Sequence, residues 1–494
     1  MQKIGFDNEK YLKMQSERIM QRVENFGGKL YLEFGGKLFD DFHASRVLPG
    51  FEPDSKMRML LELKDQAEIV FAICGDDIEK NKIRGDLGIT YDLDVLRLID
   101  VFRGYGFYVG GVVITQYAGQ PSAAAFAKKL DSMGIKNYKH YKIEGYPSKV
   151  SYIVSDEGFG KNEYVETDRS LVVVTAPGPG SGKMAVCLSQ LYHEHKRGVK
   201  AGYAKYETFP TWNLPLQHPV NLAYEAATAD LNDINMIDPY HFEAYNEQTV
   251  NYNRDVEIFP VLKAIFTQIL GECPYKSPTD MGVNMNGFCI TDNDVVEAAA
   301  KEEIVRRYFS ALCKKRKGAE NDEEISKLEV LLEKAGISPD DRKVTVAARE
   351  KFKESGKSAA AIELSDGTVI VGRSSELLSH TAAMLLNALK KLGGIQDDIM
   401  LIAPLIIEPI LKLKTDYLNN ENGQLSVKEV LTALSICAVT NTMAQRALEQ
   451  LPKIRGAELH STIILSYGDE KALKSLGLNI TCDPEYDSEK LFHS

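Results

Sequence analysis

The segment LVVVTAPGPGSGKMAVCLSQ, at residues 171–190, constrains the fold more than any other part of the chain. An apolar β-type run leads into a loop of small residues, which is followed by a lysine and a helical segment. A continuous apolar strand of this kind is typical of parallel sheets that are buried on both faces. The segment therefore predicts a strand–loop–helix unit of an α/β protein.

The same alternation of strand and helix continues on both sides of this segment. Apolar runs predict strands, and apolar positions at helical spacing predict helices between them. The expected strands are 67–75, 110–117, 171–176 and 199–207, and the expected helices are 92–103, 121–134 and 184–196. We therefore expect a doubly wound, mostly parallel sheet.

The chain of 494 residues is long enough for roughly two to four domains. Near its start the motif FGGKL occurs twice, and two Gly-Gly turns around KLYLEF predict a β-hairpin rather than a second phosphate loop. We expect a helix and β-hairpin region packed on the main domain (1–65), an α/β phosphate-binding domain with polar loops at 208–256 and 273–287 (66–310), a helical connector (311–355) and a smaller α+β domain (356–494).

Composition narrows the class of partner. A net charge of −11 argues against duplex nucleic acid and anionic membranes, both of which attract basic surfaces. The N-terminus has no apolar signal segment, and the apolar run 399–411 is broken by Pro404, Glu408 and Pro409. The seven cysteines form no CxxC pair. We expect a reduced cytoplasmic protein that binds a small phosphorylated molecule and assembles as a homo-oligomer, as metabolic enzymes of this size often do.

The loop after the expected strand 171–176 has most parts of a phosphate-binding P-loop. Gly178, Gly180 and Gly182 leave backbone N–H groups accessible, and Lys183 adds a positive charge at the start of a helix. Ser181 offers a hydroxyl beside them. These residues are the predicted site for ATP or another phosphorylated ligand. The alternative is a glycine-rich β–α turn with an incidental lysine.

Two departures from the pattern G-x-x-x-x-G-K-[S/T] affect the chemistry of this loop. Pro177 stands where the first glycine belongs, and Met184 replaces the hydroxyl that would bind Mg²⁺. A thioether is a poor ligand for magnesium, so a metal, if used, must be held by carboxylates elsewhere.

Candidate catalytic residues lie in the polar segments that follow. Glu207 ends the expected strand 199–207 and, with Asp230, is a candidate metal ligand; an exposed strand end and a solvated acidic face are the alternatives. Arg254 is a candidate phosphate clamp because its guanidinium can donate two hydrogen bonds at once. Asp280 belongs to a polar segment that resembles a substrate loop. Together with Lys183, the residues Arg254, Asp230 and Asp280 are the predicted catalytic set.

Several long strings resemble an uncharacterised bacterial family catalogued as domain of unknown function 1846. They are EFGGKLFDDFHASRVLPGF (33–51), TAPGPGSGKMAVCLSQLYHE (175–194), NYNRDVE (251–257), SPTDMGVNMNGF (277–288) and LSDGTVIVGRSSELLSHTAA (364–383). The resemblance implies a cytoplasmic bacterial protein with a P-loop-like segment and a separate C-terminal domain. It implies no reaction, because the family has none established.

The functional hypotheses therefore depend on the chemistry of the residues named above. The first is a phosphate- or nucleotide-binding enzyme that transfers a phosphoryl or nucleotidyl group to a small metabolite, a reaction that depends mainly on positioning and charge. The second is a non-catalytic protein that binds or senses a phosphorylated metabolite. The third is an oligomeric scaffold in which the glycine turn is only structural.

Overall fold

The computed structural model describes residues 3–36, 38–39, 41–84, 87–419 and 423–487. The chain forms two compact units. The N-terminal unit contains Ile4–Glu225 and Asn232–Ala300, and the C-terminal unit contains Ala226–Leu231 and the chain from Lys301 onward. In the part of the chain described here, no helix is both long and apolar enough to cross a membrane.

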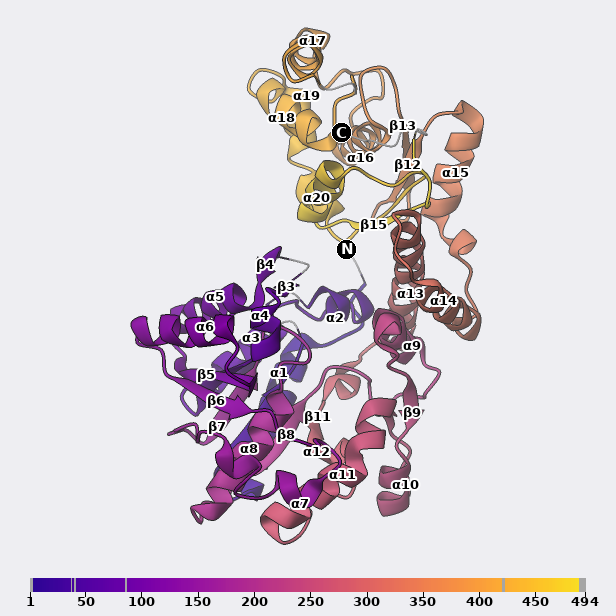
Figure 1. Cartoon of the computed structure of the whole chain (residues 1–494). Coiled ribbons are helices and arrows are strands. Elements are labelled where there is room, and N and C mark those ends of the chain that lie inside the picture. Colours follow the sequence, from indigo (N-terminus) through magenta and orange to yellow (C-terminus); the bar gives the residue numbers. More distant parts are fainter. Residues whose placement is uncertain (1–2, 37, 40, 85–86, 420–422, 488–494) are drawn as a thin grey trace. The chain divides into compact units, whose positions relative to one another are not determined.

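The N-terminal unit is built on a seven-stranded sheet with the order β11-β8-β1-β7-β2-β5-β6. Figure 1 labels β5, β6, β7, β8 and β11 of this sheet. Every pair of neighbouring strands in this sheet is parallel. The strands are β1 (Leu30–Phe34), β2 (Ala67–Cys74), β5 (Tyr108–Tyr117), β6 (Asn137–Tyr141), β7 (Leu171–Thr175), β8 (Gly202–Tyr206) and β11 (Gly282–Val283). The predicted α/β class is confirmed.

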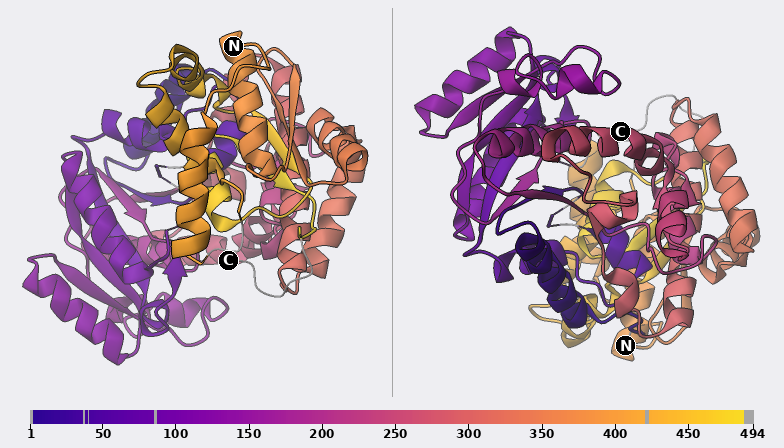
Figure 2. Two further views of the ribbon diagram at one scale, coloured as in Figure 1. Left: turned by 90° about the horizontal axis from the view of Figure 1, so that it is seen from above. Right: turned by 90° about the horizontal axis from the view of Figure 1, so that it is seen from below.

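Helices cover both faces of this sheet, as the two views of Figure 2 also show. On one face Val172 and Val174 pack with apolar side chains of α7, α8 and α11. On the other face Phe71 meets Phe102 of α5, and Tyr206 meets Tyr11 of α1. The helices are α1 (Asn8–Asn25), α3 (Ser55–Glu62), α5 (Tyr91–Gly104), α6 (Pro121–Ser132), α7 (Val150–Ile153), α8 (Lys183–Lys196) and α11 (Asn253–Leu270). Burial on both faces explains why β2 and β7 are continuous apolar runs.

The predicted hairpin near the N-terminus is wrong. Residues 30–34 form the single strand β1, which lies between β7 and β8 and is parallel to both. The first Gly-Gly pair precedes β1, with positive φ at Gly27 and Gly28, and the second pair follows it. Both pairs are therefore turns at the two ends of one central strand, and neither reverses the chain into a neighbouring strand.

The C-terminal unit contains a four-stranded sheet with the order β13-β12-β14-β15. Strand β12 is antiparallel to β13 and β14, and β14 is parallel to β15. The strands are β12 (Ala359–Glu363), β13 (Val369–Arg373), β14 (Glu458–Ser461) and β15 (Asn479–Cys482). The β12–β13 hairpin turns at Ser365–Asp366–Gly367, and Gly367 has the positive φ that the turn requires.

Helices form most of the apolar core of the C-terminal unit, and other helices precede its sheet. α16 (His380–Gly393), α18 (Val427–Cys437), α19 (Thr442–Leu448) and α20 (Tyr467–Ser475) contribute to the main apolar cluster. α13 (Asn293–Arg316), α14 (Asp322–Ala335) and α15 (Lys343–Ser355) precede β12, and α17 (Pro404–Lys412) follows α16. The segment expected as a connector, 311–355, is therefore part of this unit.

Candidate functional site

The glycine-rich loop follows β7 and leads directly into α8. In the sheet β7 lies between β1 and β2. The chain runs from β2 outward to β5 and β6 on one side, whereas from β7 it runs to β8 and β11 on the other. The loop thus lies at the carboxyl end of the strands where the winding changes direction, which is where open α/β sheets bind ligands.

Two glycines give the loop its shape. Gly180 and Gly182 have φ of +77° and +82°, in the left-handed region that side chains disfavour. Between them Ser181 is fully buried, and its hydroxyl donates to the carbonyl oxygen of Gly178 at 2.8 Å. The Ser181 hydroxyl is thus engaged within the loop.

Several backbone N–H groups of the loop have no acceptor. Within the described ranges, the N–H groups of Gly180, Gly182, Lys183 and Met184 donate no hydrogen bond. They stand at the N-terminus of the 14-residue helix α8, which carries a partial positive charge. The half-buried Lys183 also has no hydrogen bond or ion pair to any residue that the structure describes. Together these groups form a concentration of unsatisfied donors.

Gly178 has a different role from the other two glycines. A Cβ at this position would lie 2.3 Å from the hydroxyl oxygen of Tyr91, so only glycine allows this tyrosine to pack there. A Cβ at Gly180, by contrast, would meet no atom within 4 Å. Gly178 therefore supports the loop through packing, and the open space lies at Gly180.

A buried polar cluster lies at the carboxyl end of β8; we call Lys205, Glu207, Tyr252 and Asp255 the Lys205 cluster. The Lys205 Nζ lies 2.9 Å from Oε1 of Glu207, and it also contacts Oδ2 of Asp255 and the Tyr252 hydroxyl. The Tyr252 hydroxyl donates to Oε1 of Glu207 at 3.2 Å. The side chains of Lys205, Glu207 and Asp255 are 14%, 5% and 9% exposed.

Burial shifts the proton affinities within this cluster. Burial alone would lower the pKa of Lys205, but the carboxylates of Asp255 and Glu207 outweigh it and raise the pKa above its ordinary range. Burial raises the pKa of Glu207 to about 7, although the neighbouring Lys205 opposes the shift. Lys205 is therefore a fixed cation, and Glu207 is able to exchange a proton near neutral pH.

The thiol of Cys187 senses charges from both the glycine-rich loop and the end of β1. Burial raises the pKa of this thiol, Glu33 raises it further and Lys183 lowers it. Glu33, at the carboxyl end of β1, accepts a hydrogen bond from the Tyr203 hydroxyl at 2.7 Å and also raises the pKa of Lys205. Lys183, Glu33 and Lys205 therefore belong to one end of the sheet, and Cys187 is a buried packing residue there.

The other predicted catalytic residues lie elsewhere or are engaged. Arg254 forms a two-point ion pair with Asp233, at 2.6 and 2.7 Å. Asp280 precedes β11 and accepts from the Tyr245 hydroxyl at 2.9 Å. Asp230 is exposed in a short 3₁₀ turn and belongs to the C-terminal unit.

The metal prediction paired Glu207 with Asp230. Glu207 is instead bound to Lys205 inside the N-terminal unit, and Asp230 lies in the other unit. Over the ranges that the structure covers, no group of three or more His, Cys, Asp or Glu side chains is arranged to hold a metal ion. The Lys205 ammonium would compete with a metal ion for the Glu207 carboxylate.

Sequence patterns missed part of the site. Asp255 was not among the predicted residues; it lies in the first turn of α11, which begins after Tyr252 without a side-chain cap, and it pairs with Lys205. Glu33 looked like part of a hairpin. The one available signal was a charged residue at the end of each of two apolar strands, Glu33 and Glu207.

The fold and the site define the class of the protein: a two-unit α/β protein with a glycine-rich β–α loop at the switch point of a parallel sheet. The chain belongs to the family described as domain of unknown function DUF1846, whose N-terminal model matches residues 4–336 and whose C-terminal model matches residues 340–492. A UPF0371 protein of Streptococcus thermophilus (strain ATCC BAA-491 / LMD-9) is 55% identical over 492 residues, with all of both chains covered. One of Streptococcus pneumoniae (strain JJA) is 54% identical over the same length and coverage.

Proposed function

We propose that the loop from Gly178 to Met184 binds the phosphate group of a small ligand, either ATP or another phosphorylated metabolite. The observation that carries the proposal is the set of donors without acceptors at the start of α8, beside the unpaired Lys183 ammonium. Buried or half-buried donors without partners are costly, and a phosphate would accept from several of them at once.

The Lys205 cluster supports an enzyme rather than a simple receptor. Phosphoryl transfer needs a group that accepts a proton from the attacking hydroxyl, and Glu207 has a raised pKa suited to this task. Lys205, with its fixed charge, would hold Glu207 in place and stabilise negative charge that develops nearby. The proposed reaction is therefore transfer of a phosphoryl or nucleotidyl group to a hydroxyl of a small metabolite.

A second candidate function is binding without chemistry, as in a sensor of a phosphorylated metabolite. Met184 favours it, because the position that usually supplies a hydroxyl to Mg²⁺ carries a thioether. The buried Ser181 hydroxyl is already bonded to Gly178 and does not replace the missing group. In the enzyme, by contrast, Mg²⁺ would arrive bound to the nucleotide phosphates.

Thermal unfolding with phosphate compounds tests the binding site. Inorganic phosphate, ADP, ATP and sugar phosphates would be compared with and without Mg²⁺, and a ligand at a hundred times its Kd adds about 2.7 kcal/mol of stability. Lys183→Ala should abolish the shift. Lys200→Ala, which removes an exposed lysine at the far end of β8, should retain it. A melting temperature that no phosphate compound changes would contradict the proposal.

A second measurement separates the enzyme from the sensor. Release or transfer of phosphate from the ligand that gives the largest shift would be followed by phosphorus NMR with a mixture of small alcohols and sugars. Glu207→Gln should retain ligand binding and lose transfer if the enzyme proposal is right. Binding without any transfer by the native protein would favour the sensor.

A further inference from the structure

The C-terminal unit contains an open cavity of about 970 Å³ at one end of its sheet. Strands β13, β14 and β15 end at this cavity and β12 begins there. With Gln424, its walls come from five separate segments. The volume falls within the range of small-molecule sites. Its lining includes Arg349, Lys357, Ser374, Glu376, Thr462 and Asp483, all within the C-terminal unit.

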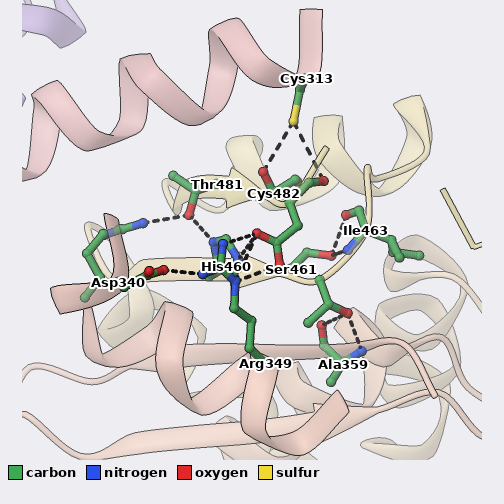
Figure 3. Close-up of polar contacts among 12 residues, drawn as sticks. Cys313, Asp340, Arg349, Ala359, His460, Ser461, Ile463, Thr481 and Cys482 are labelled. Atoms are coloured by element: carbon green, nitrogen blue, oxygen red, sulfur yellow. Dashed lines mark hydrogen bonds and ion pairs between the residues drawn. The ribbon is translucent and has the colours of Figure 1, made fainter. Parts of the chain in front are cut away.

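One wall of the cavity contains charged side chains that bind one another. Arg349 binds Asp483 through two nitrogens, with Nη2 2.7 Å from Oδ1, and His460 Nε2 lies 3.4 Å from the same oxygen. Figure 3 labels Arg349 and His460. Burial would raise the pKa of Asp483, but His460 and Arg349 outweigh it and hold the pKa at about 2. This wall is therefore rigid, and its charges already satisfy one another.

The hydroxyl groups of the lining are also satisfied by the protein. Thr462 donates to the carbonyl oxygen of Ala359 at 3.1 Å and accepts from its N–H at 3.0 Å. The hydroxyls of Ser358 and Ser374 lie 2.9 Å apart and bond to each other. Because these hydroxyls are already hydrogen-bonded, a ligand must be recognised by other side chains of the lining.

Four charged side chains that line the cavity, by contrast, are not engaged by other protein groups that the structure describes. Within the described residues, Lys357, Glu376, Glu485 and Asp487 have no side-chain hydrogen bond or ion pair. They come from three segments: Lys357 precedes β12, Glu376 follows β13, and the two others follow β15. An exposed ammonium and three exposed carboxylates thus line one cavity without pairing with one another in the described part of the chain.

We propose that this cavity binds a free amino acid, and that it prefers one with a cationic side chain. The ligand carboxylate would pair with Lys357, and its ammonium with a carboxylate on another wall, such as Glu376. The surplus of carboxylates leaves a partner for a second positive group. The site is independent of the phosphate loop, because every residue that lines it belongs to the C-terminal unit.

Isothermal titration of the full chain with L-arginine, L-lysine, L-glutamate and putrescine tests each part of the proposal. L-arginine and L-lysine should bind, and L-glutamate should bind at least about tenfold more weakly because it brings a second negative charge. Putrescine has two amines but no carboxylate, so it should also bind about tenfold more weakly than L-lysine. Putrescine binding as tight as that of L-lysine would overturn the carboxylate contact and with it the amino-acid assignment.

Substitutions of individual lining residues test which side chain contacts which group of the ligand. Lys357→Ala should weaken L-lysine about tenfold and leave putrescine unchanged, whereas Glu376→Gln should weaken both ligands. Lys353→Ala, an exposed lysine of α15 outside the cavity lining, should change neither. Circular dichroism would confirm that each variant is folded. No binding of either basic amino acid at millimolar concentration, or equal binding by all variants, would overturn the proposal.

Discussion

Thr115 of β5 donates its hydroxyl hydrogen to the carbonyl oxygen of Ser181 at 2.8 Å. This bond joins the glycine-rich loop to a strand two positions away in the sheet, across β2. Thr115 is 3% exposed, so the bond is shielded from water. The loop is therefore held in shape by the sheet itself before any ligand binds, which reduces the entropy lost on binding.

Gly182→Ala should distort this loop. Gly182 has φ of +82°, and a Cβ there would lie 3.1 Å from Oγ1 of Thr115. We expect a loss of about 1–2 kcal/mol in the free energy of unfolding, from the left-handed backbone, together with loss of the thermal shift induced by phosphate compounds. Urea unfolding and thermal scans would measure the two effects.

Gly198→Ala is the matched control for this substitution. Gly198 follows α8 with φ of +71°, but a Cβ there would meet no atom within 4 Å. This variant should lose similar stability and retain the ligand-induced shift. If Gly182→Ala also retained the full shift, the loop would not be the phosphate site.

The sequence predicted those parts of the fold that local patterns encode. The apolar runs at 67–75 and 171–176 correspond to β2 and β7, because burial on both faces demands continuous apolar side chains. Strand β1 was misassigned because Gly-Gly pairs at both its ends resemble hairpin turns, and its true partners lie far away in sequence. Strand order depends on long-range pairing, which no short segment specifies.

The candidate site likewise has one part that the sequence predicted and one part that it did not. The loop from Gly178 to Lys183 is contiguous, so its glycines and lysine could be recognised together. Glu33, Lys205 and Asp255 come from β1, β8 and α11, and they approach one another only because β1 and β8 are neighbours. Their association depends on the sheet order, which the sequence did not reveal. The two predicted metal ligands, Glu207 and Asp230, lie in different units.

Lys205→Met should strongly destabilise the N-terminal unit. It removes the cation between Glu207 and Asp255 and leaves two buried carboxylates without it. Removing one partner of a buried ion pair costs about 3–5 kcal/mol. Urea unfolding would measure the loss, with Lys200→Met as the exposed control. Adding Asp255→Leu to Lys205→Met should recover part of it, and a double variant no more stable than the single one would contradict this account.

Glu207 should make stability depend on pH below neutrality. Burial raises its pKa from 4.5 in the unfolded chain to about 7 in the folded protein. Between these values the folded state holds the proton and the unfolded state does not, so stability falls as the pH rises through this window. The slope from this group is at most about 1.4 kcal/mol per pH unit. Glu207→Gln should flatten the decline between pH 5 and 7, as urea unfolding at a series of pH values would show; an unchanged slope would contradict the shift.

Arg342 should be a main determinant of stability in the C-terminal unit. Its side chain is 3% exposed and lies 2.6 Å from both Glu302 and Glu458. It also donates to the Thr481 hydroxyl at 2.7 Å, so it joins α13 to β14 and β15. Arg342→Met leaves two carboxylates without this partner and should cost about 3 kcal/mol in the free energy of unfolding.

The neighbouring Lys343 is the matched control for Arg342. Its ion pair with Glu363 has a similar length, 2.9 Å, but the lysine side chain is 64% exposed. Solvent screens such a pair, so Lys343→Met should change stability far less than Arg342→Met. Urea unfolding of both variants would compare them directly. A large effect confined to Arg342→Met would show that the stability of the C-terminal unit depends on the buried ion pairs of Arg342. Equal effects of the two substitutions would contradict that dependence.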